Sequence, residues 1–434
     1  MAGERHTRMN DLDTSMRECT PAASPTTVLV SVTAPMSWVF FTGTFDLLRD
    51  AGYEPVLVSS PGEQLQHIGR EARVRYAAIP MRREISPLHD LLSLWRYYRL
   101  IRKVRPALTD VGTPKAGLLG GMAAWLSGVP CRIYTLFGLR LETTTGLKRL
   151  LLSITERVAC ACAHRVICVS PSLRQRAIDL KLVSAEKTVV LGSGSVRGID
   201  VARFSPDAVQ AAPKRGLATR LGISGDAPVI GFIGRLTRDK GIRELLAAFS
   251  QLRAKWPTIR LLLVGDLEDG DPVGAMVRQQ METDPGIVRV GFVAETTPYY
   301  ALMDILVLPT YREGLGYAPL EAQACGIPVV TTSATGAVDS VVDGVTGFHV
   351  PVGDCEALAD RIDQLLSDPE LRARMGQRGR ERVVQEFRHE VVGQALIGEY
   401  DRLLQARASR PVRARSRAGT ESTISARIHT PEQS

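Results

Sequence analysis

The stretch from residue 311 to residue 321 places two glutamates around a glycine-rich turn, directly after a short apolar run at 305–309. Gly314 and Gly316, on either side of Leu315, permit close approach of the backbone to a ligand. A helix that begins just after them presents unpaired N–H groups, which favour an anion. Glu313 precedes this helix and Glu321 lies inside it, eight positions later, so the two carboxylates could bind a ligand at two points. The residues alone equally allow that Glu313 caps the helix and Glu321 faces solvent.

A second candidate segment, residues 231–241, also follows an apolar run. The predicted strand ends at Gly234, and the cations Arg235 and Lys240 come next. In a parallel sheet the carboxyl ends of the strands form the ligand-binding edge. Arginine offers a bidentate fork and lysine a point charge, so together they suit a diphosphate. The alternative is an ordinary solvated basic loop.

Acidic residues follow a third predicted strand, at 260–264. Asp269 and Asp271 form an Asp-x-Asp pair, which can hold a divalent metal, but the glycine between them is typical of a turn. We therefore expect no metal site. The seven cysteines include no Cys-x-x-Cys pair, so neither a disulfide framework nor structural zinc is expected. His164 and His349 stand in or beside apolar runs and are expected to be core or edge residues.

The elements that position these residues are short apolar runs alternating with segments of helical length. Continuous apolar strands between helices predict a parallel sheet covered on both faces. The pattern occurs twice and is interrupted at 193–225, a region rich in Gly, Ser, Pro and Ala. The sequence therefore predicts an α/β protein with two doubly wound domains and a ligand site in the cleft between them. The strands are expected at 27–32, 54–60, 74–79, 107–111, 131–136, 165–170 and 188–191, and then at 229–234, 260–264, 287–293, 305–309, 329–332 and 348–350.

The 434 residues divide into five predicted parts. These are a disordered extension at 1–27, a first domain at 28–212, a second at 213–388, a helix at 389–405 and a disordered Arg-rich tail at 406–434. The net charge is +8, and five arginines without an acid at 407–417 supply much of it. There is no apolar run of about 18 residues that could span a membrane, and residues 1–26 lack the apolar core of a secretory signal. We therefore expect a cytoplasmic protein.

The second half resembles the donor domain of the family 4 retaining glycosyltransferases, whose GT-B architecture has two Rossmann-like domains facing across a cleft. Glu313 and Glu321 match the family's E-x7-E motif, and Arg235 and Lys240 match its phosphate-binding cations. Residues 326–330 and 343–348 match its closing segments, and the whole resemblance spans about 28–395. It implies that Glu313, Arg235 and Lys240 act in catalysis, that no metal or cofactor is needed, and that donor binding falls to Glu321, Gly314, Leu315, Gly316 and Gly234.

The first half is similar to a narrower group, the capsular and exopolysaccharide glycosyltransferases that extend lipid-linked sugars. Residues 59–62, 80–87, 113–120 and 166–172 carry this resemblance. Two positions depart from it: many relatives have histidines where this chain has residues 110–112, and His-Gly where it has Phe137 and Gly138. Contact with the acceptor is therefore assigned to candidates of another type, Asp110, Lys115 and Glu142. Gly43, in a Phe-Thr-Gly-Thr segment, is expected to bring backbone towards the phosphates.

The resemblance implies transfer of a hexosyl or N-acetylhexosaminyl group from a nucleoside-diphosphate sugar, expected to be a UDP-sugar, to a lipid-linked saccharide. In similar enzymes retention is explained by front-face attack, with the departing phosphate taking the acceptor's proton, so no side-chain nucleophile is expected. The alternatives are a soluble small-metabolite acceptor, a sugar-nucleotide epimerase of similar build, and an inactive sugar-nucleotide binder. We find no nucleic-acid-binding motif, so no nucleic-acid partner is expected.

A predicted helix at 90–105 indicates an anionic membrane surface as a further partner. At about 100° per residue its apolar face and a separate basic stripe form an amphipathic pattern with aromatic residues, which suits a lipid interface. We expect peripheral attachment to the inner face of the cytoplasmic membrane. The alternative is that the apolar face packs on the protein's own sheet. The apolar face holds Leu91, Leu94, Trp95, Tyr98 and Ile101, and the basic stripe Arg96, Arg99 and Lys103.

Overall fold

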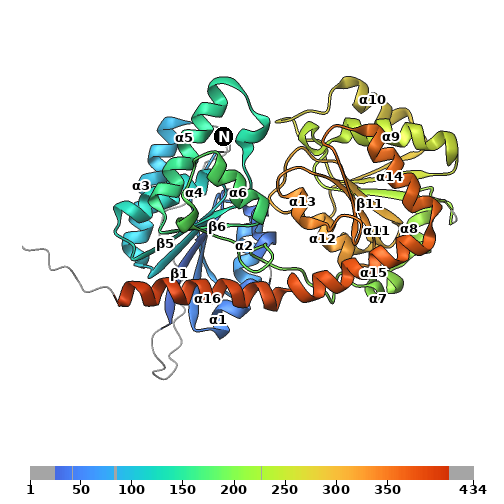
Figure 1. The fold of residues 1–434 in the computed structure, drawn as a ribbon. Helices are drawn as coiled ribbons and strands as arrows, with labels where there is room; N and C mark the ends of the chain where they lie inside the picture. The colour runs from blue at the N-terminus through green and yellow to red at the C-terminus, as the bar shows by residue number, and fades with distance from the viewer. Residues whose placement is uncertain (1–24, 42, 83–85, 226, 410–434) are drawn as a thin grey trace, which may run out of the picture.

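The computed structural model describes residues 25–409 apart from residues 42, 83–85 and 226. Two α/β domains, each built on one parallel sheet, lie side by side (Figure 1). The last helix of the described residues runs from the second domain back along the first. The prediction of two doubly wound domains is therefore confirmed.

The first domain contains seven parallel strands within the described chain, in the order β3-β2-β1-β4-β5-β6-β7. Its strands are continuous apolar runs because helices cover both faces of the sheet. The strands are β1 (Thr26–Ser31), β2 (Tyr53–Ser59), β3 (Arg75–Ala78), β4 (Leu108–Gly112), β5 (Cys131–Leu136), β6 (Arg165–Cys168) and β7 (Thr188–Val189). The helices are η1 (Pro35–Phe41), α1 (Thr44–Asp50), α2 (Glu63–Glu71), α3 (Pro87–Val104), α4 (Pro114–Leu126), η2 (Arg140–Thr143), α5 (Gly146–Cys162), α6 (Pro171–Asp179) and η3 (Ala185–Lys187).

The second domain contains six parallel strands within the described chain, in the order β10-β9-β8-β11-β12-β13. The strand order reverses between β8 and β11, the point at which doubly wound sheets bind ligands. The strands are β8 (Val229–Ile233), β9 (Arg260–Val264), β10 (Ile287–Gly291), β11 (Ile305–Leu308), β12 (Val329–Thr332) and β13 (Gly347–Val350). The helices are η4 (Arg238–Lys240), α9 (Ile242–Lys255), α10 (Ala275–Thr283), α11 (Thr297–Tyr300), α12 (Tyr317–Ala324), α13 (Ala337–Ser340), α14 (Cys355–Ser367) and α15 (Pro369–Glu386).

The predicted domain boundary at residue 212 lies in a segment whose contacts with the second domain begin earlier in the chain. It falls between α7 (Pro206–Ala211) and α8 (Lys214–Arg220), and α7 already packs against α11 of the second domain. Just before α7, the ring of Phe204 meets that of Tyr300 edge-on at 5.9 Å between centroids. The composition of this region is typical of a linker, and the long-range contacts that join it to the second domain leave no trace in local composition.

The ends of the chain differ slightly from the predicted parts. β1 begins at Thr26, inside the predicted extension at 1–27, because the Thr26 amide donates a hydrogen bond to Gly52 O at 3.1 Å beside the paired strand β2. The predicted helix at 389–405 is α16 (His389–Ala408), which takes in the start of the predicted tail at 406–434. Residues 1–24 and 410–434, predicted to be disordered, lie outside the described residues.

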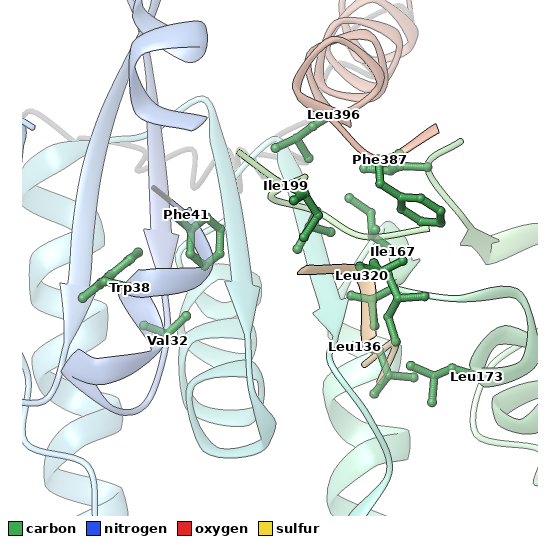
Figure 2. Packing of buried hydrophobic residues seen from close by; sticks show 14 of the residues in the cluster. Val32, Trp38, Phe41, Leu136, Ile167, Leu173, Ile199, Leu320, Phe387 and Leu396 are labelled. Carbon is green, nitrogen blue, oxygen red and sulfur yellow. The ribbon is translucent and has the colours of Figure 1, made fainter. Parts of the chain in front are cut away.

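The chain crosses between the domains near Ile199 and again near Phe387, and these two segments contact each other. Ile199 N donates a hydrogen bond to Phe387 O at 2.6 Å, and both side chains are buried with Leu396 of α16 in one apolar cluster (Figure 2). Farther along α16, Glu399 forms an ion pair with Arg165 of β6 at 2.8 Å. Helix α16 therefore stabilises the first domain and its position beside the second.

Candidate active site

Arg235 and Lys240 lie in the loop between β8 and α9, residues 234–241, at the carboxyl edge of the second sheet. Gly241 has a φ of +71°, and a Cβ on it would lie 1.9 Å from Pro309 O. Only glycine therefore lets this loop pack against the loop between β11 and α12, residues 309–316. The two predicted motifs come together in space because both loops follow strands that are neighbours in the sheet.

Lys240 and Glu313 form an ion pair between these loops, and only 14% and 17% of their side-chain surfaces are exposed. A second pair lies beside it, with Arg312 Nη2 at 2.5 Å from Asp239 Oδ2. Burial alone would raise the pKa of Asp239, but Arg312, the Thr237 hydroxyl and Lys240 together hold it below its usual value. The charged side chains thus form one network that keeps Lys240 and Glu313 at the strand ends.

Arg235 occupies the outer side of the site. Its side chain is 55% exposed and pairs with Glu268, which lies in the loop after β9. The same loop supports the basic one, since Asp271 accepts a hydrogen bond from Asp239 N at 2.8 Å and pairs with Arg238 at 3.2 Å. Asp271 is thus used in joining two loops. Within the described residues, no three His, Cys, Asp or Glu side chains are grouped so as to hold a metal ion.

The glycines of the second motif bring the two domains into contact. A Cβ on Gly314 would lie 2.2 Å from Phe137 O of the first domain, and Ser170 Oγ donates to Gly314 O at 2.7 Å. Gly316 has a φ of +82° and directly precedes α12, so the N–H groups of that helix begin at the domain boundary. The side chain of Leu315 is buried in the core, which leaves only its backbone to face a ligand.

Glu321 does not face solvent, and Glu313 does not cap α12, which has no side-chain cap. In the second turn of the helix, Glu321 accepts hydrogen bonds from Arg197 and from the Tyr300 hydroxyl, both at 3.0 Å. Burial, followed by the charge of Glu321, raises the pKa of Tyr300 well above its usual value, so this hydroxyl remains a donor. The guanidinium of Arg197 lies 4.0 Å from the centre of the Tyr317 ring. These contacts fix the orientation of the Glu321 carboxylate.

Two of the residues predicted to contact an acceptor have other partners. Asp110 is buried within β4 and accepts hydrogen bonds from Thr135 and Tyr400, both at 2.6 Å. Burial raises the pKa of Asp110. This carboxyl group fastens α16 to the first sheet, which corrects its prediction as an acceptor contact. Lys115, at the start of α4, forms an ion pair with Asp90 of α3 at 2.8 Å and joins these two helices.

Glu142, by contrast, lies where the domains meet. Its Oε1 accepts hydrogen bonds from Thr335 of the second domain at 2.9 Å and from Arg176 at 3.0 Å. Its Oε2 is buried and has no hydrogen-bond partner within the described structure. The predicted approach of the Gly43 backbone to the phosphates stays a prediction. A Cβ on Gly43 would lie 2.7 Å from His389 Nδ1. The close approach that requires a glycine there is to the start of α16.

Sequence reasoning missed Arg197, Arg312 and the contact of Ser172 with Asp339. Arg197 reaches Glu321 from 124 residues away, out of the region interpreted as a linker, so no local pattern marks it. Ser172 N donates to Asp339 Oδ2 at 3.0 Å and joins α6 to α13 across the domain boundary. Arg312 could have been found, because a third cation directly beside Glu313 is visible in the sequence.

Two family models match the chain, one in each domain. The glycosyl transferase 4-like domain matches residues 38–194, and glycosyl transferases group 1 matches residues 216–382. The capsular polysaccharide biosynthesis glycosyltransferase CapM of Staphylococcus aureus is 37% identical over 374 residues, which cover 86% of this chain and 96% of CapM. The UDP-Gal:alpha-D-GlcNAc-diphosphoundecaprenol alpha-1,3-galactosyltransferase of Escherichia coli is 26% identical over 308 residues, 70% of this chain and 78% of that enzyme.

Solved structures show the same architecture. HepE from Anabaena, in complex with UDP and glucose, superposes with a TM-score of 0.70 at 22% identity, over 86% of this chain and 99% of HepE. A glycosyltransferase from Rickettsia africae superposes with a TM-score of 0.71 at 20% identity, over 88% of this chain and 99% of that protein. These likenesses show the GT-B fold, and the identity with CapM extends over nearly its whole length. The chain therefore belongs to the family 4 glycosyltransferases, as its motifs predicted, and is a glycosyltransferase of capsular or cell-surface polysaccharide biosynthesis.

Proposed function

We propose that this enzyme transfers a hexosyl or N-acetylhexosaminyl group from a UDP-sugar to a lipid-linked saccharide, with retention of the anomeric configuration. The observation that carries the proposal is the position of Arg235 and Lys240 on one loop beside Glu313, at the edge of the sheet where the domains meet. Two cations there suit the charge of a nucleoside diphosphate. UDP and a lipid-linked acceptor are supported by the E. coli relative, a galactosyltransferase that uses UDP-Gal and a diphosphoundecaprenol-linked sugar.

Charge stabilisation is the main task of this site in the proposed reaction. The bond from the anomeric carbon to the diphosphate breaks through an oxocarbenium-like state, and negative charge grows on the leaving group. Lys240, Arg235 and the amides of residues 314–316 stabilise that charge. In the structure both cations are paired with carboxylates, Lys240 with Glu313 and Arg235 with Glu268. The diphosphate replaces these partners, and Glu313 then accepts hydrogen bonds from the hydroxyls of the donor sugar.

We assign the ribose hydroxyls to Glu321. Arg197 and Tyr300 each donate to a different oxygen of its carboxylate, and each oxygen keeps a further lone pair for a ligand. The acceptor hydroxyl attacks on the face that the diphosphate leaves, and the departing phosphate takes its proton. The proposal therefore needs neither a side-chain nucleophile nor a metal ion.

On the acceptor side we propose Glu142. It lies at the domain boundary, and its Oε2 is without a hydrogen-bond partner within the described residues. We also propose that the protein works at the inner face of the cytoplasmic membrane as a peripheral protein. No helix of the described residues is both long and apolar enough to cross a bilayer.

The proposal is tested in two steps. Calorimetric titration with UDP, GDP and ADP should show tightest binding of UDP, and Lys240→Ala should weaken it. A panel of UDP-sugars is then incubated with bacterial lipid extracts, with products identified by mass spectrometry and the new anomeric centre by NMR. A glycosylated lipid with the donor's configuration is expected. An inverted product, an isomerised donor or a glycosylated soluble metabolite would each contradict the proposal, and the last two would support the epimerase and soluble-acceptor alternatives.

A further inference from the structure

Large apolar side chains gather on the outside of three neighbouring helices of the first domain. α4 packs between α3 and α5, and Figure 1 shows the three helices together on the first domain. Of the eighteen large apolar side chains that are exposed in the described structure, eleven belong to these helices. We call their outward faces the three-helix surface. Its exposed apolar members are Leu88, Leu91, Leu92, Trp95 and Tyr98 of α3, Trp125 and Leu126 of α4, and Leu147, Leu150, Leu151 and Ile154 of α5.

The inward side of α3 differs from the sequence prediction. Ile101, predicted on the outward apolar face, is buried together with Ser93 and Tyr97. Leu91 and Trp95 point outward and are 65% and 51% exposed. The predicted apolar face is therefore divided: Leu94 and Ile101 pack against the protein's own core, as the alternative expected, whereas Leu91, Trp95 and Tyr98 do not. Exposed apolar patches of this extent on a folded domain mark an interaction surface.

The charge on the three-helix surface has one sign. Only two acidic residues lie on the three helices, and both are at least partly buried. Asp90 is paired with Lys115 at 2.8 Å, and Glu156 is buried and accepts a hydrogen bond from Tyr134 at 2.7 Å. The exposed charges are all basic: Arg96, Arg99, Arg102 and Lys103 on α3, and Lys148, Arg149 and Arg157 on α5.

We infer that the three-helix surface docks on an anionic lipid bilayer. Its apolar side chains, Trp95 and Trp125 among them, enter the interface while the basic side chains reach the lipid phosphates. The guanidinium of Arg99 lies 4.7 Å from the centre of the Trp95 ring, so a cation and an indole are held together at this surface. A second copy of this chain is a poorer occupant, because two basic faces would repel each other.

The position of α5 gives this surface a role in the reaction, an argument that rests on the proposed function. α5 follows η2, whose last residue, Thr143, accepts a hydrogen bond from Arg312 Nε at 2.9 Å beside Glu313. Leu147, four positions later, is 80% exposed. The three-helix surface thus extends to the domain boundary at the candidate site. A lipid-linked acceptor can keep its lipid in the bilayer while its saccharide reaches Glu313.

Two of the four tryptophans report directly on docking. Trp95 and Trp125 lie on the three-helix surface, whereas Trp38 is buried and Trp256 lies in the second domain. The full-length protein is mixed with phosphatidylglycerol–phosphatidylcholine vesicles that carry brominated acyl chains. We expect strong quenching of tryptophan fluorescence, and little quenching in the Trp95→Phe/Trp125→Phe variant. No donor or acceptor is present, so vesicle docking can fail while UDP binding succeeds, and UDP binding can fail while docking succeeds. The two proposals are therefore tested separately.

Co-sedimentation with the same vesicles measures how much each part contributes. Removing the basic side chains in Arg96→Gln/Arg99→Gln/Lys103→Gln should weaken binding about fivefold per residue, or about 10²-fold in total at low salt. Leu147→Gln/Leu150→Gln should weaken it at least about tenfold. Matched controls in the second domain should bind like the wild type. These are Met276→Gln/Phe292→Gln for the apolar pair, at 85% and 62% exposure, and Arg215→Gln/Arg220→Gln/Arg374→Gln for the basic residues.

Three outcomes would overturn the inference. The first is a wild-type protein that stays in the supernatant with anionic vesicles at low salt. The second is vesicle binding that the three-helix variants keep and that deletion of residues 410–434 abolishes, which would assign the contact to the tail. The third is a concentration-dependent dimer, in sedimentation without lipid, that Leu147→Gln/Leu150→Gln abolishes. That result would assign the surface to a second copy of the chain.

Discussion

Replacing Lys240 with alanine tests the proposed role of the site in holding the diphosphate. Lys240 is only 14% exposed and points at Glu313, so its charge acts where solvent screens it weakly. Removing one preorganised group that stabilises charge in a transition state costs about 10²–10³ in rate, or about 2.7–4 kcal/mol. Because Lys240 is mostly buried, we expect the rate loss of Lys240→Ala to lie towards the upper end of this range. Arg235 is more than half exposed, so the rate loss of Arg235→Ala should lie near the lower end, at about 10²-fold.

The stability effect of the same change must be separated from the rate effect. Lys240→Ala leaves the mostly buried Glu313 carboxylate without its cation, which costs about 1–3 kcal/mol of stability. Lys240→Ala/Glu313→Gln removes that unpaired charge and should recover stability without recovering rate. Lys255→Ala is the matched control, since Lys255 pairs with Asp363 at 2.7 Å on the exposed side of α9.

The assay is steady-state turnover of the identified donor, with unfolding measured by urea titration of each variant. We expect the kcat of Lys240→Ala to be far lower than the kcat of Lys255→Ala, at a temperature where all variants remain folded. If Lys240→Ala and Arg235→Ala both turn over within a few-fold of the wild type, the cations do not hold the leaving diphosphate. The reasoning also fails if the double variant recovers the rate.

Three further predictions concern metal ions and the buried carboxyl groups. Activity should persist in EDTA; loss of activity that Mg²⁺ or Mn²⁺ restores would contradict this. Tyr400→Phe takes one of the two side-chain donors from the buried Asp110 and should lower the free energy of unfolding by about 1–3 kcal/mol, measured by urea titration, whereas Tyr98→Phe, at an exposed position, should change it little. Burial raises the pKa of Glu156 to about 7, above its unfolded value, so the folded protein holds the extra proton and loses stability as pH rises from about 4.5 to 7. Glu156→Gln can still accept a hydrogen bond from Tyr134. Its stability relative to the wild type should therefore rise by up to about 3 kcal/mol between pH 5 and pH 8. A stability difference that does not change with pH would show that the carboxyl group is not held protonated.

The positions of the proposed donor residues could be predicted from the sequence because they follow from chain order. A loop after a parallel strand always lies at the carboxyl edge of its sheet, so Arg235, Lys240 and Glu313 had to lie on one side of the second domain. The acceptor half could not be predicted in the same way. Asp110 lies two residues before the end of β4, within the sheet, and its partner Tyr400 comes from 290 residues away. Neither fact has a local sequence signal.

The same limit explains why α3 was only partly predicted, and the discrepancy itself carries information. A hydrophobic period sorts residues by polarity and would place Ser93 and Tyr97 outward. In the structure they lie inward because both hydroxyls have partners there: Ser93 donates to Pro80 O at 2.5 Å, and the Tyr97 hydroxyl bonds with that of Ser31 at 2.6 Å. Polar groups that are satisfied inside leave leucines and tryptophans outside, against the usual pattern of a domain surface. Exposed apolar side chains on three adjacent helices, with no exposed acid among them, are what the proposed docking on an apolar and anionic partner requires.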